Sequence, residues 1–392
     1  MAGRFRNLGN VYILGTVSLL TDLSSQMVFP LIPLFMTSVL GAGAAMVGLV
    51  EGAAEAVASI LKAFSGRWSD RARQRKPFVV GGYGFSALMK PLFSIAGSWA
   101  SVLAIRTGER IGKGIRNAPR DALVAESVDD RIRGRAFGIQ RAMDGAGSIL
   151  GALAAWLLLS PLGYRKVFLY AGIPAGAAVL VALFVKERRA GRVRDGENGE
   201  KPRIGFSALP PGLRLYILSA AVFTLGHFGY PFMLLRARDV GLTDTRAVLF
   251  YVIFYGVYTL VSVPAGTLSD RTGRKPMLLV CYPFFGAISL LLWAAGSGWA
   301  ILACFMLYGV FFGMIDGVQR AFVTDLCPPE LKATALGTFH AAIGLSALPG
   351  GIIAGLLWQR FSPGATFAWG AAMSAAGLAL LLPVDNGRER TT

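Results

Sequence analysis

Long apolar segments follow one another along almost the whole of the 392-residue chain. A helix needs about 20 apolar residues to cross the hydrocarbon core of a bilayer, where helices satisfy their own backbone hydrogen bonds. The pattern therefore predicts an all-α membrane protein with about twelve transmembrane helices. The expected spans are 11–39, 45–64, 77–96, 99–125, 135–159, 165–185, 213–236, 246–265, 275–296, 299–325, 333–358 and 363–383.

The composition argues against several classes of protein. Hydrophobic residues make up 54% of the chain and charged residues 16%, which excludes an ordinary soluble domain. The net charge of +17 is typical of basic cytoplasmic loops, so no nucleic-acid partner is expected. The sequence contains no catalytic or metal-binding motif, and its three cysteines are far apart. We therefore expect neither an enzyme nor a cofactor or metal site.

Basic residues predict the orientation of the chain in the membrane. They gather in both tails, in the polar segment that begins near residue 186, and in the loops after the second, fourth and eighth spans. The turns after the first, third and ninth spans carry no charge. By the positive-inside rule, we expect a multi-pass protein of the cytoplasmic (inner) membrane with both termini in the cytoplasm.

Two near copies of one loop divide the chain into halves. GRWSDRARQRKP at 66–77 and GTLSDRTGRKP at 266–276 each follow the second span of a half. Repeats of this kind occur in secondary transporters, which hold the substrate between the halves near the bilayer midplane. We expect an N-terminal six-helix half at 1–185, a cytoplasmic linker at 186–212 and a C-terminal six-helix half at 213–392.

The repeated loop resembles the G-x-x-x-D-R-x-G-R-K signature of the major facilitator superfamily (MFS). The C-terminal copy matches it fully, whereas the N-terminal copy has one extra residue and lacks the inner glycine. The resemblance covers the whole chain and implies two pseudo-symmetric halves that rock about a central site. It also implies a cytoplasmic gate formed by Gly66, Asp70, Arg71, Gly266, Asp270, Arg271, Arg274 and Lys275.

The fourth span carries an unusual run of charge, IRTGERIGKGIRNAPRD, at 105–121. At about 100° per residue, its charged side chains fall within an arc of about 140°. Each charge at bilayer depth costs about 3 kcal/mol, so this face is expected to meet a water-filled cavity or partner charges. The helical rise places Arg106 about 10 Å and Arg110 about 16 Å below the outer surface. Nearer the cytoplasm, we expect the gate to include Arg116, Arg120 and Asp121.

Polar residues on the other spans complete the candidate site. A carboxylate in a low-dielectric cavity takes up a proton more readily than in water, which suits coupling. We expect proton coupling through Asp22, Glu51 or Glu55. Substrate contact or cavity lining is expected from Arg106, Arg110, Arg141, Asp144, His227, Tyr255, Asp316 and His340. The alternative is internal pairing that fixes helix packing, as in Arg141–Asp144 or Glu109–Lys113.

These features predict a secondary active transporter that works by alternating access. The cationic face favours a small organic solute with an anionic group, and the carboxylates suggest proton coupling. A drug or metabolite efflux pump and a lipid or lysolipid flippase are alternatives on the same scaffold. We expect the protein to function as a monomer in the bilayer, with a small-molecule substrate and protons as its partners.

Overall fold

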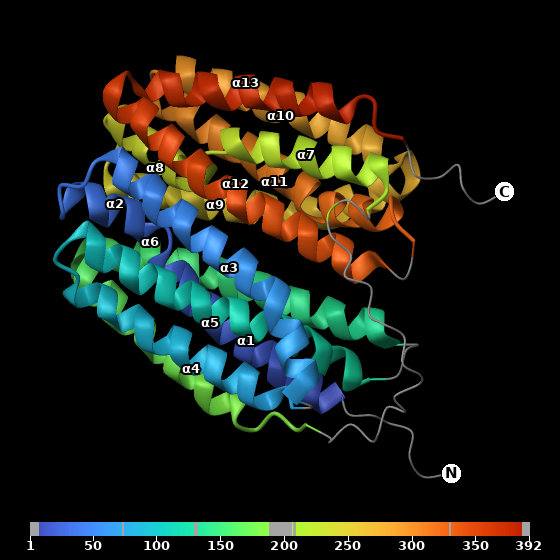
Figure 1. Cartoon of the computed structure of the whole chain (residues 1–392). Helices are drawn as coiled ribbons and strands as arrows, with labels where there is room; N and C mark the ends of the chain where they lie inside the picture. Colours follow the sequence, from blue (N-terminus) through green and yellow to red (C-terminus); the bar gives the residue numbers. More distant parts are fainter. Residues whose placement is uncertain are drawn as a thin grey trace, which may run out of the picture.

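The computed structural model describes residues 8–72, 74–128, 132–187, 206, 209–328 and 331–385. Every regular element in this part of the chain is a helix. Figure 1 shows the helices side by side in one bundle, with the first half of the chain (blue to green) below the second half (yellow to red). We call the end of the bundle at which α6 ends and α7 begins the linker end, and the opposite end the far end.

The helices follow the expected spans closely. The first half contains α1 (Leu8–Val28), α2 (Leu31–Ser38), α3 (Ala44–Ala72), α4 (Lys76–Leu92), the 3-10 turn η1 (Phe93–Ile95), α5 (Trp99–Glu126) and α6 (Arg133–Ala182). The second half contains α7 (Pro211–Gly226), α8 (Gly229–Asp239), α9 (Asp244–Thr272), α10 (Arg274–Ala294), α11 (Gly298–Asp325), α12 (Lys332–Arg360) and α13 (Pro363–Leu381).

The number of membrane passes depends on α5 and α6. Ten described segments are long and apolar enough to cross a membrane, and α5 is not among them because of its charges. The 50-residue α6 is a single one of those segments, but Gly163 inside it has the non-helical angles φ 70° and ψ 169°. A straight helix of that length would measure about 75 Å, more than twice the hydrocarbon core. Two passes meeting at Gly163, together with α5, account for the expected total of about twelve.

The first pass of each half is broken, which the apolar pattern did not indicate. The expected span 11–39 is divided between α1 and α2 at Phe29 and Pro30, where proline supplies no backbone N–H. The expected span 213–236 is divided between α7 and α8, because His227 leaves the helical conformation at φ −79° and ψ 92°. The breaks lie at corresponding places in the two halves, and the second one brings irregular backbone to the cavity between the halves.

Small residues bring the halves into direct contact along α3 and α12. A Cβ atom built on Gly48 of α3 would lie 1.9 Å from the carbonyl oxygen of Gly351 on α12. One turn along, a Cβ atom on Gly52 would lie 2.8 Å from the carbonyl oxygen of Ala347. Such close approach is how membrane helices gain van der Waals contact without large side chains.

A polar cluster around Asp244, at the start of α9, joins the halves at the far end. Ser38 donates to Asp244 Oδ2 at 2.9 Å, and the Tyr164 hydroxyl donates to the same oxygen. From the same half as Asp244, Arg238 approaches Oδ1 at 3.0 Å and donates to Thr37 Oγ1 across the seam at 2.8 Å. These five residues tie α2 and α6 to α8 and α9.

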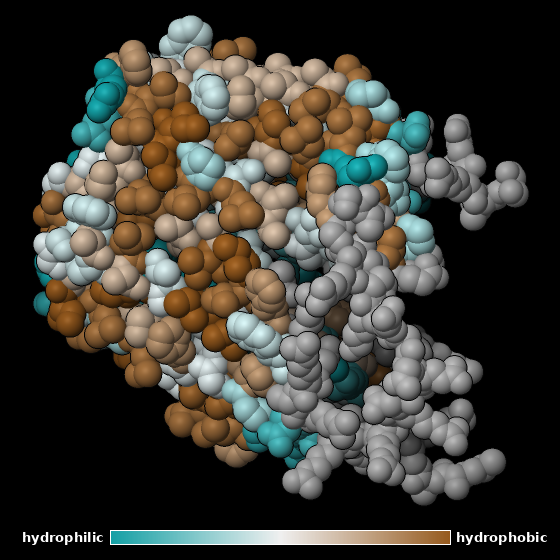
Figure 2. All heavy atoms as spheres, in the orientation of Figure 1, coloured by the Kyte–Doolittle hydropathy of each residue, from teal (hydrophilic) through white to brown (hydrophobic). Residues whose placement is uncertain are grey.

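The outer surface suits a bilayer. Figure 2 shows hydrophobic residues (brown) across the middle of the visible face, with hydrophilic residues (teal) mainly towards the two ends. Large apolar side chains such as Leu88 of α4 and Leu260 and Val263 of α9 are exposed. The apolar surface therefore forms the face that contacts lipid, and the charges of α5 lie inside.

The close contact at Gly48 predicts a sharp penalty for one methyl group. Gly48→Ala should lower the melting temperature of the purified protein by several degrees, because overpacking a tight interface costs about 1–3 kcal/mol. Gly81→Ala on α4 is the matched control, since no atom lies within 4 Å of its added Cβ. Equal melting temperatures for the two variants, measured by thermal unfolding in detergent, would contradict the close seam.

Candidate functional site

A cavity of about 540 Å³ lies between the two halves. It is lined by α3 and α5 from the first half and by α7, α8, α11 and α12 from the second. Gly48 and Gly351, which touch at the seam, also line it, so the α3–α12 contact forms one of its walls. Its volume is within the range of about 300–1,000 Å³ that is usual for small-molecule sites.

The wall from the first half is charged. Glu51, Glu55 and Lys62 on α3 line the cavity at helical spacing, and Arg110 and Lys113 on α5 line it from the neighbouring helix. Arg110 makes a 3.7 Å ion pair through Nε with Glu109, and its guanidinium carbon lies 5.1 Å from the centroid of the Phe29 ring. Among the described residues, its side chain forms no hydrogen bond. The Lys113 ammonium group likewise forms no hydrogen bond with the described residues. Two cations are thus available to a ligand.

The wall from the second half is aromatic. Phe223, Tyr308 and Phe311 line it and surround His227, whose Nε2 lies 2.9 Å from the Tyr308 hydroxyl oxygen. The ring centroids of these three side chains lie 6.0–6.1 Å from that of His227. Further rings that line the cavity are Phe228, Tyr230, Phe232, Phe312 and Phe339. Most of this wall is therefore an aromatic surface.

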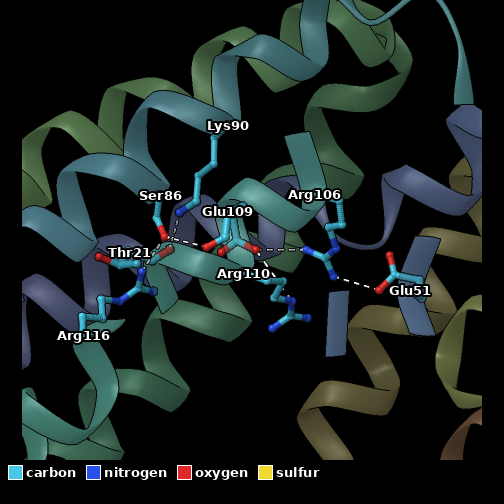
Figure 3. A network of polar contacts seen from close by, with 8 residues as sticks. All are labelled: Thr21, Glu51, Ser86, Lys90, Arg106, Glu109, Arg110 and Arg116. Carbon is cyan, nitrogen blue, oxygen red and sulfur yellow. Dashed lines mark hydrogen bonds and ion pairs between the residues drawn. The ribbon is translucent and has the colours of Figure 1, made fainter. Parts of the chain in front are cut away.

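Arg106 lies behind the cavity and does not line it. Its side chain is fully buried, and its Nη2 and Nη1 groups lie 2.9 Å from Glu51 Oε2 and 3.4 Å from Glu109 Oε2. Its guanidinium carbon is 3.9 Å from the centroid of the Phe29 ring at the break after α1. Figure 3 shows Arg106 between its two carboxylates, with the head of Arg110 directed away from this row.

A buried polar network continues from Glu109 towards α1 and α4 (Figure 3). Lys90 is fully buried and donates to the carbonyl oxygen of Thr21 at 3.1 Å. Ser86 donates to the backbone carbonyl of Glu109 at 2.9 Å and accepts from Arg116 Nη1 at 2.6 Å. Arg116 therefore faces α4, where it also lies over a tyrosine ring, and not an exit from the cavity.

The structure thus divides the charged face of α5 into three parts. Arg110 and Lys113 line the cavity, while Arg106, Glu109 and Arg116 are buried against neighbouring helices. Nearer the linker end, Arg120 holds its neighbour Asp121 at 2.8 Å and donates to Ser18 of α1 at 3.1 Å.

Several other candidates lie outside the lining of the cavity. Asp22, Arg141, Asp144 and Tyr255 are not among its lining residues. Asp144 accepts from Gln140 at 3.1 Å, and within the described part of the chain neither Arg141–Asp144 nor Glu109–Lys113 forms an ion pair.

Tyr255 takes part in a clamp between the halves. Gln26 on α1 donates to the Tyr255 hydroxyl at 2.6 Å and accepts from the Tyr251 hydroxyl at 2.7 Å. Both tyrosines are on α9, so a single amide from the first half holds two side chains of the second. In the sequence, this contact was indicated only by the presence of a polar residue, Gln26, within an apolar span.

The repeated loop can be described only in its second copy. The side chains of Gly66, Asp70 and Arg71 lie outside the described ones. In the second copy, Arg274 approaches Asp270 at 3.1 Å and Asp325, the last residue of α11, at 2.5 Å. Beside these pairs, Arg271 is exposed, Gly266 lies in α9, and Lys275 donates to the Leu382 carbonyl at 2.9 Å. These contacts join helices of one half.

Two polar pairs line the cavity nearer the linker end. Lys62 Nζ lies 3.3 Å from His340 Nε2 across the seam between α3 and α12. Beside it, Arg320 approaches Asp316 on the same helix, α11, at 2.7 Å. Sequence reasoning selected His340 and Asp316 but left Lys62 and Lys113 out of the site. Both lysines share a helical face with selected residues, which was the signal available.

Comparison with known proteins identifies the family. The Major Facilitator Superfamily model matches residues 14–253 and 216–392. The chain belongs to the Major Facilitator Superfamily. It is therefore a multi-pass membrane protein of a family of transporters, which are not enzymes.

Relatives and solved structures match most or nearly all of the chain. An uncharacterised MFS-type transporter of Methanocaldococcus jannaschii is 39% identical, over 95% of this chain and 94% of its own. The cis,cis-muconate transport protein of Acinetobacter baylyi is 26% identical, over 70% of this chain and 69% of its own. The crystal structure of the nucleoside transporter NupG is 14% identical with a TM-score of 0.77, over 95% of this chain and 97% of its own, which shows the shared fold.

The two neighbouring arginines of α5 should respond differently to substitution. Arg106→Gln leaves Glu51 and Glu109 without their shared cation, and breaking a buried pair costs about 3–5 kcal/mol. We expect a large fall in melting temperature or loss of folded protein. Arg110→Gln removes a cation that faces the cavity and should leave the melting temperature within a few degrees of wild type. Thermal unfolding checks this, and equal losses in the two variants would contradict the assignment.

Proposed function

We propose that this MFS chain transports a small organic anion with an apolar or aromatic body across the cytoplasmic membrane. The two halves, at 1–185 and 213–392, rock about the cavity, and both termini lie on the cytoplasmic side. The distribution of basic loops supports this orientation, because positive residues concentrate at the linker end. The linker end is then cytoplasmic, and the Asp244 cluster closes the outer side.

The single observation that carries the proposal is the division of the cavity into two walls. Arg110 and Lys113 present cations from one half, and a field of aromatic rings faces them from the other. Such a site suits a ligand that is charged at one end and apolar at the other. A carboxylate or phosphate would receive charge-assisted hydrogen bonds, which are about twice as strong as neutral ones. The flat body would pack against the aromatic wall.

Glu55 acts as the counter-ion when the cavity holds no anion. It lines the cavity, and the charges that act on it most strongly are Arg110, Lys113, Arg106 and Lys62. An incoming carboxylate can take over part of this interaction, so the cations have an anionic partner both with and without substrate. The muconate transported by the relative from Acinetobacter baylyi is a dicarboxylate, which supports an anionic substrate.

Coupling to protons is part of the proposal. Of the carboxylates selected from the sequence, Glu51 and Glu55 line the cavity and Asp22 does not. Glu51 is held by Arg106 through Oε2, and its Oε1 atom has no hydrogen-bond partner within the described residues. A proton that travels with the anion would make transport nearly electroneutral and allow the proton gradient to drive accumulation.

A ligand screen by thermal shift tests the substrate class. Benzoate and cis,cis-muconate should raise the melting temperature by a few degrees, because a ligand at about 100 times its Kd stabilises by about 2.7 kcal/mol. Benzyl alcohol, an uncharged ring, should have little effect. The shift should fall strongly in Arg110→Gln and Lys113→Gln, but not in Lys332→Gln, which removes an exposed lysine outside the cavity.

Other outcomes of the screen would favour the alternatives. Stabilisation by neutral or cationic drugs alone would favour a drug or metabolite efflux pump, and stabilisation by lysolipids would favour a flippase. Uptake of labelled benzoate or muconate into proteoliposomes under an imposed proton gradient then tests transport itself. Binding without uptake in either direction would contradict the proposed function.

A further inference from the structure

Both histidines of the chain line the cavity, but their surroundings differ. His227 lies among aromatic rings, with the Tyr308 hydroxyl 2.9 Å from its Nε2. His340 Nε2 instead lies 3.3 Å from the ammonium nitrogen of Lys62, in the opposite half. His227 is thus surrounded by uncharged groups, whereas His340 contacts a lysine directly.

The contact between Lys62 and His340 determines how many protons the pair carries. An ammonium group has three donors and no acceptor, and a protonated imidazole also has only donors. A hydrogen bond between Nζ and Nε2 therefore requires one of the two groups to be uncharged. Because a neutral imidazole is common near pH 7, the natural state is a charged Lys62 that donates to a neutral His340. In this geometry the pair is one proton short of its full charge.

The charged groups around the pair would not compensate for a second positive charge on it. The charges that act on the pair are Glu55 on the same helix as Lys62, Asp121 on α5, Arg141 on α6 and Arg320 on α11. Asp316 also lies nearby, but it is paired with Arg320 at 2.7 Å. Three carboxylates and two arginines leave one excess negative charge, which the charge on Lys62 already balances, so a second positive charge on the pair would be uncompensated. An anion placed between Lys62 and His340 would change this balance.

We propose that Lys62 and His340 form an anion subsite that binds one proton together with each substrate anion. This inference rests on the proposed function, because it assigns the coupling proton of that transporter to a residue. The proton comes from solution and bonds to Nε2 of His340. The anion then accepts from Lys62 Nζ and from the new N–H of His340, in place of the bond between them. On release, the anion and the proton leave, and the Lys62–His340 bond forms again.

The position of the subsite gives it a role in the transport cycle. Lys62 and His340 are on α3 and α12, the helices in contact along the seam. Towards the linker end beyond this pair, no hydrogen bond joins described side chains of the two halves. An anion here bridges the halves at the linker-end limit of the hydrogen bonds between their described side chains. Binding and protonation favour each other by equal amounts, since linkage between two ligands is reciprocal.

The carboxylates are less suited to this role. Glu51 is occupied by Arg106, and Glu55 is the counter-ion of several cations. Asp22 does not line the cavity, so an anion would not meet it directly. His340 is the group whose protonation creates a donor at the place where an anion would bind.

Proton uptake on ligand binding tests the subsite. Benzoate, fully ionised at pH 7, is added to the purified protein in weakly buffered detergent solution with a pH-indicator dye, and its binding is measured in parallel. Wild type should take up about one proton per benzoate bound. His340→Gln keeps a neutral acceptor for Lys62 and cannot be protonated, so it should bind benzoate, within about tenfold of wild type, with no uptake. Lys332→Gln, at an exposed lysine outside the cavity, is the control and should take up the same proton as wild type.

The outcomes separate this inference from the proposed function. If wild type binds benzoate and cis,cis-muconate without proton uptake, or if His340→Gln still takes up the proton, the subsite is wrong and the anion transporter stands. A His227→Gln variant, at the other histidine of the cavity, that still binds benzoate but takes up no proton would also overturn the subsite. If neither anion binds wild type, the proposed function fails, and the subsite fails with it. His340→Asn repeats the test should the glutamine variant not fold.

Discussion

The buried contact of Arg106 with Glu51 and Glu109 is the interaction on which the site depends. A guanidinium at this depth is tolerated only because two carboxylates and the ring of Phe29 surround it. The contact links α3 to α5 and reaches the break between α1 and α2. It therefore fixes the rotation of α5, and that rotation directs Arg110 and Lys113 into the cavity. A buried guanidinium that does not line the cavity thus decides which charges the ligand meets.

Much of the architecture could be predicted because membrane chemistry restricts it. Apolar length predicted the passes, and the repeated loop predicted two halves. The charges of α5 were also correctly expected to avoid lipid. Periodicity could not tell which of these charges meet water and which meet partner helices, because all of them fall on one broad arc. Arg106 and Arg116 were therefore assigned to the cavity and the gate, whereas the structure buries both against neighbouring helices.

The contacts between the halves were harder to predict for a different reason. Gln26 meets Tyr251 and Tyr255 over more than 200 residues of sequence, and Lys62 meets His340 over a still longer separation. No local pattern encodes such a pairing. The breaks after α1 and α7 were also missed, because an apolar segment remains apolar whether or not its helix is continuous. Pro30 was the visible sign of the first break, and the second is marked by Gly229 at φ 64°.

The glycine seam between α3 and α12 has a consequence for the speed of the cycle. Its contacts at Gly48 and Gly351 are backbone against backbone, with no ion pair to desolvate when they form or part. Dispersion forces of this kind are individually small, about 0.1–0.2 kcal/mol per atom pair, and lipid tails or water can replace them. Helices held in this way separate through many small steps and meet no single large activation barrier. The energy barrier to relative motion of α3 and α12 at these contacts should therefore be small. The rate of turnover should then be set by the charged pairs on either side of the seam.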